Sequence, residues 1–273
     1  MPTNVSNLPD LICQILQDHA FMMVYQPILS LKDHCVVGYE ALCRPKLNQP
    51  ELCKDVETFV QAIEQLGLYQ QFDLAVAKAV FNDIQNCAEL NHQQHFVHIN
   101  LCAESLNSQS FCDQLELLLT QYHFADGKIR FEITERSAIT DESKDKNLLR
   151  LALTGCQFVI DDFITGYSNF GALINPFMSA VKVDQSVTQQ LTQNSIADKF
   201  MKSLIALLIA IDKNLIIEGV ENSAQLEFLR NNQCDFVQGY YLAKPMVKEL
   251  LPFANNAALL MLDEKHKVPQ NSV

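Results

Sequence analysis

Strand-like and helix-like segments alternate along most of this chain, and this order limits the fold more than any other feature of the sequence. Apolar runs of strand length are each followed by a longer segment with apolar residues at helical spacing. Repeated strand–helix–strand units predict a largely parallel sheet. The predicted strands are His95–Leu101, Lys128–Glu135, Gln157–Asp162, Ala180–Asp184, Leu215–Glu218 and Phe236–Tyr240, and the predicted helices are Val56–Leu68, Gln70–Leu90, Gln109–His123, Glu142–Leu153, Ile196–Asp212, Ala224–Asn232 and Val247–Met261.

The beginning and the end of the chain follow a different pattern. Apolar residues at helical spacing predict a short amphipathic helix at Leu8–His19. Two predicted strands follow at Met22–Leu31 and Val36–Leu42, and their short connection makes them antiparallel because a parallel crossover needs about a dozen residues. No internal linker rich in Pro, Gly or Ser is present, so residues 1–262 are predicted to form a single domain and residues 263–273 a disordered tail.

Polar residues occur at or near the C-terminal ends of the predicted strands. In an open sheet the outermost of these residues would lie far apart, whereas in a closed barrel all of them would surround one mouth, where the active sites of such barrels lie. We therefore predict an α/β fold, namely a TIM-like (β/α)8 barrel with an antiparallel first strand pair. The polar strand-end residues are Glu40, Asn100, Glu132, Asp161, Asp162, Lys182, Glu218 and Gln238.

Two adjacent carboxylates, Asp161 and Asp162, follow the apolar run Phe158–Ile160 and lead into a loop. Carboxylates forced together raise each other's pKa or bind a metal, and hard divalent ions such as Mg²⁺ and Mn²⁺ prefer oxygen ligands. The alternative is that one aspartate only caps a following helix. Lys182 lies in an otherwise apolar strand, where a buried ammonium group is costly without anionic partners, so we expect it to face the carboxylates.

Composition excludes several classes of function. The formal net charge of −12 argues against non-specific binding to nucleic acid polymers or anionic membranes. No apolar segment reaches the roughly 20 residues that span a bilayer, and the first residues do not have the pattern of a secretory signal. The nine cysteines include no C-x-x-C pair, which predicts reduced thiols in a cytoplasmic protein. The histidines of His92–His98 do not have a zinc-site spacing, so we expect them to be packed or solvated.

The segment Glu40-Ala-Leu42, with Arg44 just beyond it, resembles the signature of EAL domains, the bacterial phosphodiesterases of cyclic di-GMP. The resemblance covers about Leu8 to Met261 and implies hydrolysis of cyclic di-GMP to linear pGpG. Two alternatives remain, namely a weak or inactive EAL-like domain that acts as a cyclic di-GMP receptor or protein-interaction module, and an unrelated metal-dependent hydrolase on the same barrel. Further blocks similar to the family are Tyr25–Ile28, Asn100-Leu101, Glu132–Glu135, Asp161–Phe163, Lys182–Asp184, Glu218–Glu221 and Gln238–Tyr240.

The resemblance also implies roles for individual residues and two Mg²⁺ or Mn²⁺ ions as cofactors. One ion would be held by Glu40, Asn100, Glu132 and Asp161, and Asp161 would bridge to a second ion that Asp162 also binds. The implied catalytic residues are Lys182, which positions the water between the metals, Glu218 as general base or water-mediated ligand, Gln238 in the water network, and Glu135 as the anchor of the loop after Asp162. The implied substrate-binding residues are Gln26, Leu42, Arg44, Asp184 and Pro245.

One position departs from the family pattern. Ile164 follows Asp-Asp-Phe, where the family commonly has Gly, in the loop that couples substrate, metal and dimer interface. A β-branched residue does not readily adopt positive φ, so we expect this loop to be locally rearranged or stiffer. Glu135 agrees with the family pattern, and so do the residues that follow Ile164, namely Thr165–Ser168. The resemblance further implies a homodimer formed through the barrel, and a regulatory protein partner is a further expectation.

Overall fold

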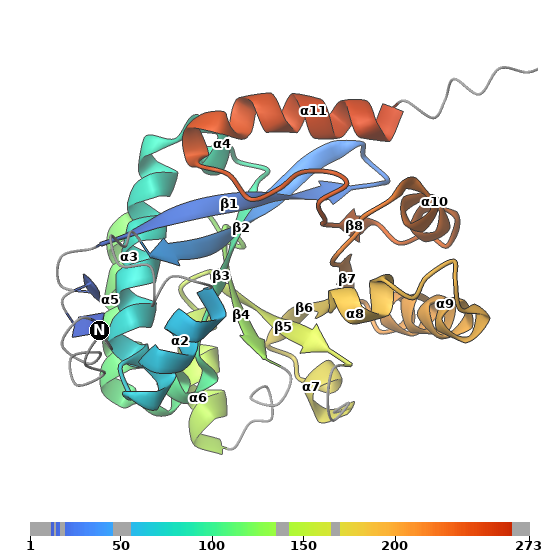
Figure 1. Ribbon diagram of the computed structural model, residues 1–273. Coiled ribbons are helices and arrows are strands. Elements are labelled where there is room, and N and C mark those ends of the chain that lie inside the picture. Colours follow the sequence, from blue (N-terminus) through green and yellow to red (C-terminus); the bar gives the residue numbers. More distant parts are fainter. Residues whose placement is uncertain are drawn as a thin grey trace, which may run out of the picture.

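The computed structural model describes residues 12–13, 15–16, 20–45, 56–134, 142–164 and 170–263. Eight strands close into a barrel in the order of the sequence (Figure 1). Neighbouring strands are parallel except that β1 pairs antiparallel with both β2 and β8, which confirms the predicted barrel and its antiparallel first pair. The strands are β1 (Phe21–Ser30), β2 (Cys35–Pro45), β3 (Phe96–Asn100), β4 (Ile129–Thr134), β5 (Gln157–Phe163), β6 (Met178–Val183), β7 (Asn214–Ile217) and β8 (Phe236–Val237).

Helices surround the barrel, and the last of them, α11, lies along the β1–β2 hairpin (Figure 1). None of the helices within the described ranges combines the length and the apolar character needed to span a bilayer. The helices are α2 (Val56–Gln65), α3 (Tyr69–Asn86), α4 (Ala88–Asn91), α5 (Gln109–Tyr122), α6 (Glu142–Ala152), α7 (Phe170–Ile174), α8 (Gln185–Thr188), α9 (Ser195–Ala210), α10 (Ser223–Asn231) and α11 (Leu251–Asp263), with 3₁₀ turns η2 (Ala103–Asn107) and η4 (Lys248–Leu250).

The hydrophobic core has two parts. The larger cluster joins helices to the outer face of the barrel, as Phe81 of α3 and Leu208 of α9 illustrate. The smaller cluster takes one residue from each of five strands and fills the barrel interior below the polar residues. Alternate side chains of a strand share one face, so on β3, β5, β6 and β7 the residue two positions beyond the apolar side chain points into the barrel one layer nearer its mouth. On β1, which runs in the opposite direction, the corresponding residue is Gln26, two positions before Ile28. The smaller cluster consists of Ile28, Phe96, Val159, Ala180 and Ile216.

Some predicted element boundaries are wrong. The segment Gln70–Leu90 is not one helix, because Cys87 has an extended backbone with φ −132° and ψ 117° and separates α3 from α4. The last helix begins at Leu251 and not at Val247, since Pro252 favours the first turn of a helix and the preceding residues form the turn η4. Strand β8 is also shorter than the predicted Phe236–Tyr240.

The structure describes only some of the residues covered by the predictions for the two chain termini. Of the predicted helix Leu8–His19, the structure describes Ile12, Cys13, Ile15 and Leu16, and these residues are helical. Ile12 and Ile15 are buried and belong to the larger core cluster, which agrees with an amphipathic helix covering part of the core. Residues 264–273, which contain nearly all of the predicted disordered tail, lie outside the described residues.

Candidate active site

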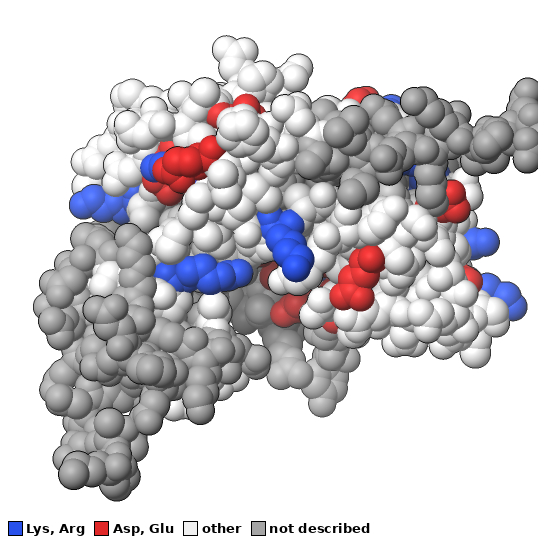
Figure 2. Space-filling model, turned by 45° about the horizontal axis from the view of Figure 1, so that its top comes forward, with Lys and Arg blue, Asp and Glu red and all other residues white. Residues whose placement is uncertain are grey.

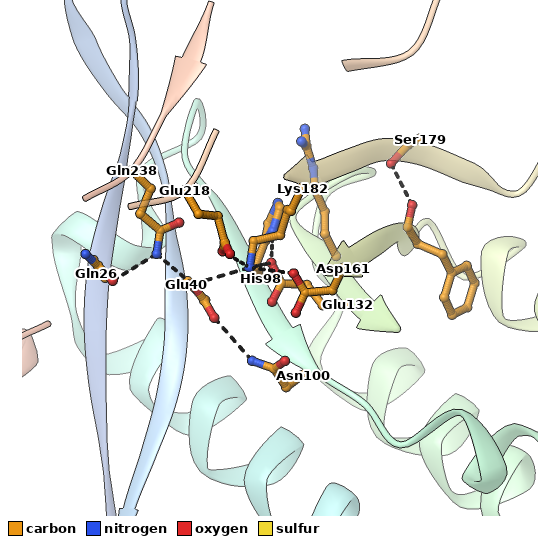
Figure 3. A network of polar contacts seen from close by, with 12 residues as sticks. Gln26, Glu40, His98, Asn100, Glu132, Asp161, Ser179, Lys182, Glu218 and Gln238 are labelled. Carbon is orange, nitrogen blue, oxygen red and sulfur yellow. Dashed lines mark hydrogen bonds and ion pairs between the residues drawn. The ribbon is translucent and has the colours of Figure 1, made fainter. Parts of the chain in front are cut away.

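Polar side chains from all parts of the barrel converge at its mouth, where the C-terminal ends of the parallel strands meet (Figure 3). Their positions follow from strand geometry, because Asp161 lies two residues beyond the interior Val159, and Lys182 two residues beyond Ala180. The converging residues that Figure 3 labels are Gln26, Glu40, Asn100, Glu132, Asp161, Lys182, Glu218 and Gln238. The predicted ring of strand-end residues is therefore one spatial cluster.

The ammonium group of Lys182 lies among four carboxylates. Its Nζ is 2.7 Å from Glu218 Oε1, 2.8 Å from Glu132 Oε1, 3.3 Å from Asp161 Oδ1 and 3.4 Å from Glu40 Oε2. The lysine side chain is 1% exposed. Burial disfavours its charged form, but the carboxylates outweigh this effect and raise the pKa of Lys182 well above its ordinary value. Lys182 thus faces the carboxylates, as its apolar strand predicts.

One ammonium group does not neutralise so many acids. Burial raises the pKa of Glu132 well above its ordinary value, and Lys182 offsets this only in part. Burial also raises the pKa of Glu218 to about 8. For Asp162, burial and the adjacent Asp161 raise the pKa to about 6. The cluster carries an excess of negative charge that a bound cation would relieve.

Several oxygen atoms of the cluster are available to such a cation. Glu132 Oε2 and Gln238 Oε1 are buried and make no hydrogen bond within the described part of the chain. Asp161 Oδ1 is also buried without a hydrogen bond there, but lies 3.3 Å from Lys182 Nζ. Asp161, Asp162 and Glu218 each offer a carboxylate oxygen, and these oxygens lie within 4.8 Å of one another. An all-oxygen donor set of this kind suits a hard divalent ion. The cluster is therefore a candidate metal site, and it brings Glu218 close to the two aspartates.

A β-bulge allows the two adjacent aspartates to serve one site. Between two pairing positions, β5 advances from Ile160 to Phe163 while β6 advances by only two residues, from Val181 to Val183. In a regular strand, neighbouring side chains point to opposite faces, so Asp161 and Asp162 would be separated. Here the extra residue redirects the strand, as bulges near active sites commonly do, and Asp162 has a φ of 54°.

The backbone at Ile164 contradicts one expectation from the sequence. Ile164 has a φ of 85°, so the expectation that a β-branched residue avoids positive φ here is wrong. Left-handed backbone costs an L-residue roughly 1–2 kcal/mol. The Ile164 side chain packs against the larger core cluster, and this contact offsets the cost. The neighbouring Thr165–Ser168 and the predicted loop anchor Glu135 lie outside the described residues.

An amide network holds the opposite side of the cluster. Gln238 Nε2 donates to Gln26 Oε1 at 3.0 Å and to Glu40 Oε2 at 2.6 Å. Gln26 Nε2 in turn donates to the backbone oxygen of Ala243 at 3.0 Å. Asn100 Nδ2 donates to Glu40 Oε1 at 3.3 Å, so both oxygens of Glu40 have amide donors. These contacts fix the orientation of two predicted metal ligands (Figure 3).

A cavity of about 260 Å³ adjoins the cluster and brings together three of the predicted substrate-binding residues, Gln26, Leu42 and Asp184. Glu218 and the exposed ring of Tyr240 also line it. Figure 2 shows acidic side chains in a hollow of the molecular surface with basic side chains beside it. The cavity therefore offers a ligand direct access to the carboxylates.

The other two predicted substrate residues lie apart from this cavity. Arg44 lines a neighbouring cavity of about 280 Å³, which also reaches Asn100 and Glu132. Its Nη1 donates to the backbone oxygen of Cys43 at 2.9 Å. Pro245 lines neither cavity and precedes the short contact between Met246 and β1.

His98 lies beneath the site and was not among the predicted site residues. Its Nδ1 is 2.6 Å from Glu132 Oε1, and both side chains are fully buried. Burial lowers the pKa of His98 well below its ordinary value, so the imidazole is neutral. The prediction of packed or solvated histidines describes its burial but not this contact. A signal was present, since His98 lies two residues before Asn100 on β3 and therefore shares its face.

Residues 10–245 match the sequence model of the EAL domain family. The chain belongs to the EAL domain family. This EAL domain is 32% identical over 234 residues to cyclic di-GMP phosphodiesterase NbdA of Pseudomonas aeruginosa, a match that covers 85% of this chain and 30% of NbdA. It is 28% identical over 249 residues to cyclic di-GMP phosphodiesterase RocR of the same organism, which covers 90% of this chain and 63% of RocR.

Solved structures confirm the family fold. The structure described as PaMucR phosphodiesterase in complex with c-di-GMP superposes with a TM-score of 0.79 at 26% identity, covering 90% of this chain and 99% of that chain. The EAL domain described here spans less than two thirds of the length of NbdA and of RocR.

Proposed function

We propose that this EAL domain is a metal-dependent phosphodiesterase that hydrolyses cyclic di-GMP to linear pGpG. The observation that carries the proposal is a buried carboxylate cluster, in which Glu132 Oε2 makes no hydrogen bond to the described residues, and which opens into a cavity lined by Gln26, Leu42 and Asp184. The names of NbdA and RocR, both cyclic di-GMP phosphodiesterases, and the c-di-GMP complex of PaMucR support the same substrate for this chain.

Two Mg²⁺ or Mn²⁺ ions are the proposed cofactors. Glu40, Asn100, Glu132 and Asp161 would hold one ion, and Asp161 and Asp162 would hold the other. All of these residues offer oxygen donors, and the buried Oε2 of Glu132 has no hydrogen-bond partner in the part of the chain that the structure describes, so the residues fit hard divalent ions. When bound, such ions would supply an activated water and neutralise charge on the phosphoryl oxygens.

Lys182, Glu218 and Gln238 are the proposed catalytic residues. The surrounding carboxylates fix the Lys182 ammonium group, so it is placed to donate a hydrogen bond to the attacking water. Glu218 is the proposed general base or water-mediated ligand, because its Oε1 lies 2.7 Å from Lys182 Nζ and its side chain lines the cavity beside the two aspartates. The amide of Gln238, held by two hydrogen bonds, would order the water network. Glu135 is the proposed anchor of the loop after Asp162.

The substrate would contact residues on both sides of the carboxylates. Gln26, Leu42 and Asp184 would bind the nucleotide in the cavity that they line. Arg44 would reach a phosphate from the neighbouring cavity, because its planar donor fork matches two phosphate oxygens. Pro245 is the proposed fifth contact, in the segment to which Gln26 is hydrogen-bonded.

A homodimer is also proposed, with α9 as part of its interface. Ile196, Phe200 and Leu207 are exposed and lie along one face of α9, and a second copy would cover this apolar surface. A cytoplasmic location is proposed as well, supported by the free thiols of the described cysteines. A regulatory protein is proposed as the source of the input signal.

The test compares nucleotide binding and hydrolysis in the wild type, Asp161→Asn and a control, Asp113→Asn. Asp113 lies on α5 and pairs with Arg150, away from the candidate site. With Mg²⁺, the wild type and Asp113→Asn should both form pGpG, whereas a folded Asp161→Asn should lose nearly all turnover because the amide lacks the charge that would hold two cations. A wild type that binds cyclic di-GMP and leaves it intact would identify a receptor instead.

A further inference from the structure

We propose that His98 is a positioning residue that orients the carboxylate of Glu132 for metal binding, an inference that rests on the proposed function. His98 Nδ1 lies 2.6 Å from Glu132 Oε1, and neither side chain is exposed (Figure 3). A hydrogen bond to a metal-ligating group fixes the orientation of that group and commonly changes metal affinity by 10- to 100-fold. Glu132 is a proposed ligand, so His98 meets the geometric requirement for this role.

The contacts of Glu132 define what His98 does. Lys182 Nζ lies 2.8 Å from Oε1, so this oxygen is an acceptor, and we assign the His98 proton to Nδ1, from which it donates to the same oxygen. With Oε1 held by two donors, the carboxylate is prevented from rotating, and Oε2, which is buried and makes no hydrogen bond to any described residue, is the oxygen left for a cation. His98 Nε2 then carries a lone pair and no proton, so its lack of a partner among the described residues leaves no donor unsatisfied.

A stack of side chains inside the barrel holds the imidazole in place. The Phe96 ring lies 4.8 Å from the His98 ring, and the guanidinium carbon of Arg130 lies 3.7 Å from the centre of the Phe96 ring. Gly38 on β2 makes room for Phe96, because a Cβ at this position would come within 2.3 Å of the ring. The chain thus keeps His98 from turning away from Glu132.

A structural role is the competing explanation, since a buried histidine also fills space. The two roles differ in what a donor-retaining variant does. In His98→Asn the side-chain amide nitrogen takes the place of Nδ1, so the hydrogen bond to Glu132 is retained while much of the ring volume is lost. In His98→Leu the volume is retained and the donor is lost.

His95 supplies a matched control on the same segment of chain. Its Nδ1 lies 2.7 Å from the backbone oxygen of Glu89, and its ring packs edge-on against Tyr39 at 5.4 Å. Neither partner belongs to the candidate metal site. His95→Leu should therefore lower thermal stability without changing metal affinity.

The experiment measures the Kd for Mn²⁺ by calorimetry, turnover of cyclic di-GMP and the thermal transition of each variant. We expect His98→Leu to weaken Mn²⁺ binding by roughly 10- to 100-fold, His98→Asn to recover most of the affinity, and His95→Leu to bind like the wild type. Should His98→Leu fail to fold, His98→Ser, whose hydroxyl is too short to reach Glu132, replaces it in the same comparison.

The outcomes separate this inference from the proposed function. A folded His98→Leu or His98→Ser with wild-type Mn²⁺ affinity would overturn the positioning role, and so would a His98→Asn that binds as weakly as His98→Leu. A wild type that binds Mn²⁺ but does not hydrolyse cyclic di-GMP would overturn the proposed activity and leave the positioning role intact.

Discussion

Replacing Lys182 by Met should destabilise the fold, because four carboxylates would lose their buried counter-ion. The Nζ distances of 2.7–3.4 Å each correspond to roughly 5 kcal/mol of attraction at an effective dielectric constant of about 20. Desolvation and repulsion among the acids cancel most of that sum. Removal of one partner from a buried ion pair costs about 3–5 kcal/mol in practice, which corresponds to a loss of about 10 °C in Tm for a domain of this size.

The assay is thermal unfolding followed by circular dichroism in EDTA, at pH 8 and at pH 5.5. Without Lys182 the carboxylates have higher pKa values in the folded state than in the unfolded state. Lowering the pH protonates them, so the loss of Tm relative to the wild type should be smaller at pH 5.5 than at pH 8. Lys213→Met is the control, since Lys213 Nζ donates to the backbone oxygens of Asn175 and Met178, and its deficit should be the same at both pH values. A Lys182→Met protein as stable as the wild type at pH 8, or equally destabilised at both pH values, would refute the reasoning.

Three further predictions address other parts of the chain. Ile164→Gly should change the free energy of unfolding by less than about 1 kcal/mol, because glycine adopts positive φ without strain and this gain offsets the lost packing. Ile164→Pro should lower the free energy of unfolding by more than that, because proline cannot adopt positive φ, and calorimetry of both variants tests this. Burial raises the pKa of Asp73 to about 7, so its contribution to the free energy of unfolding should decrease as the pH rises from about 4 to 7, and Asp73→Asn should make the fall in stability over this range smaller than in the wild type, as measured by urea titrations. Glu218→Gln should reduce turnover by roughly 100-fold or more while changing the Kd for cyclic di-GMP far less; equal losses would reassign Glu218 to binding.

The barrel and the convergence of its polar strand-end residues could be predicted because both depend on local sequence patterns. Alternating strands and helices with polar residues at strand ends require a common mouth once the sheet closes. Lys182 was predictable for a related reason, since an ammonium group in an apolar strand needs anionic partners, and the structure supplies four of them.

The remaining features depend on pairing between distant segments. The bulge that directs Asp161 and Asp162 to one site arises from the register of β5 against β6, which the sequence of β5 does not contain. The positive φ of Ile164 is a consequence of the chain path after that bulge and of core contacts from elsewhere. The role of His98 depends on the neighbouring strand β4, which carries Glu132 opposite Asn100.

The most direct test of the central claim is chromatographic separation of the products formed when the purified protein is incubated with cyclic di-GMP in Mg²⁺, in Ca²⁺ and in EDTA. The candidate oxygen-rich site predicts pGpG in Mg²⁺, little product in Ca²⁺ because the larger ion tolerates irregular coordination, and none in EDTA. Intact cyclic di-GMP in the presence of Mg²⁺, or equal hydrolysis in EDTA, would contradict a metal-dependent phosphodiesterase.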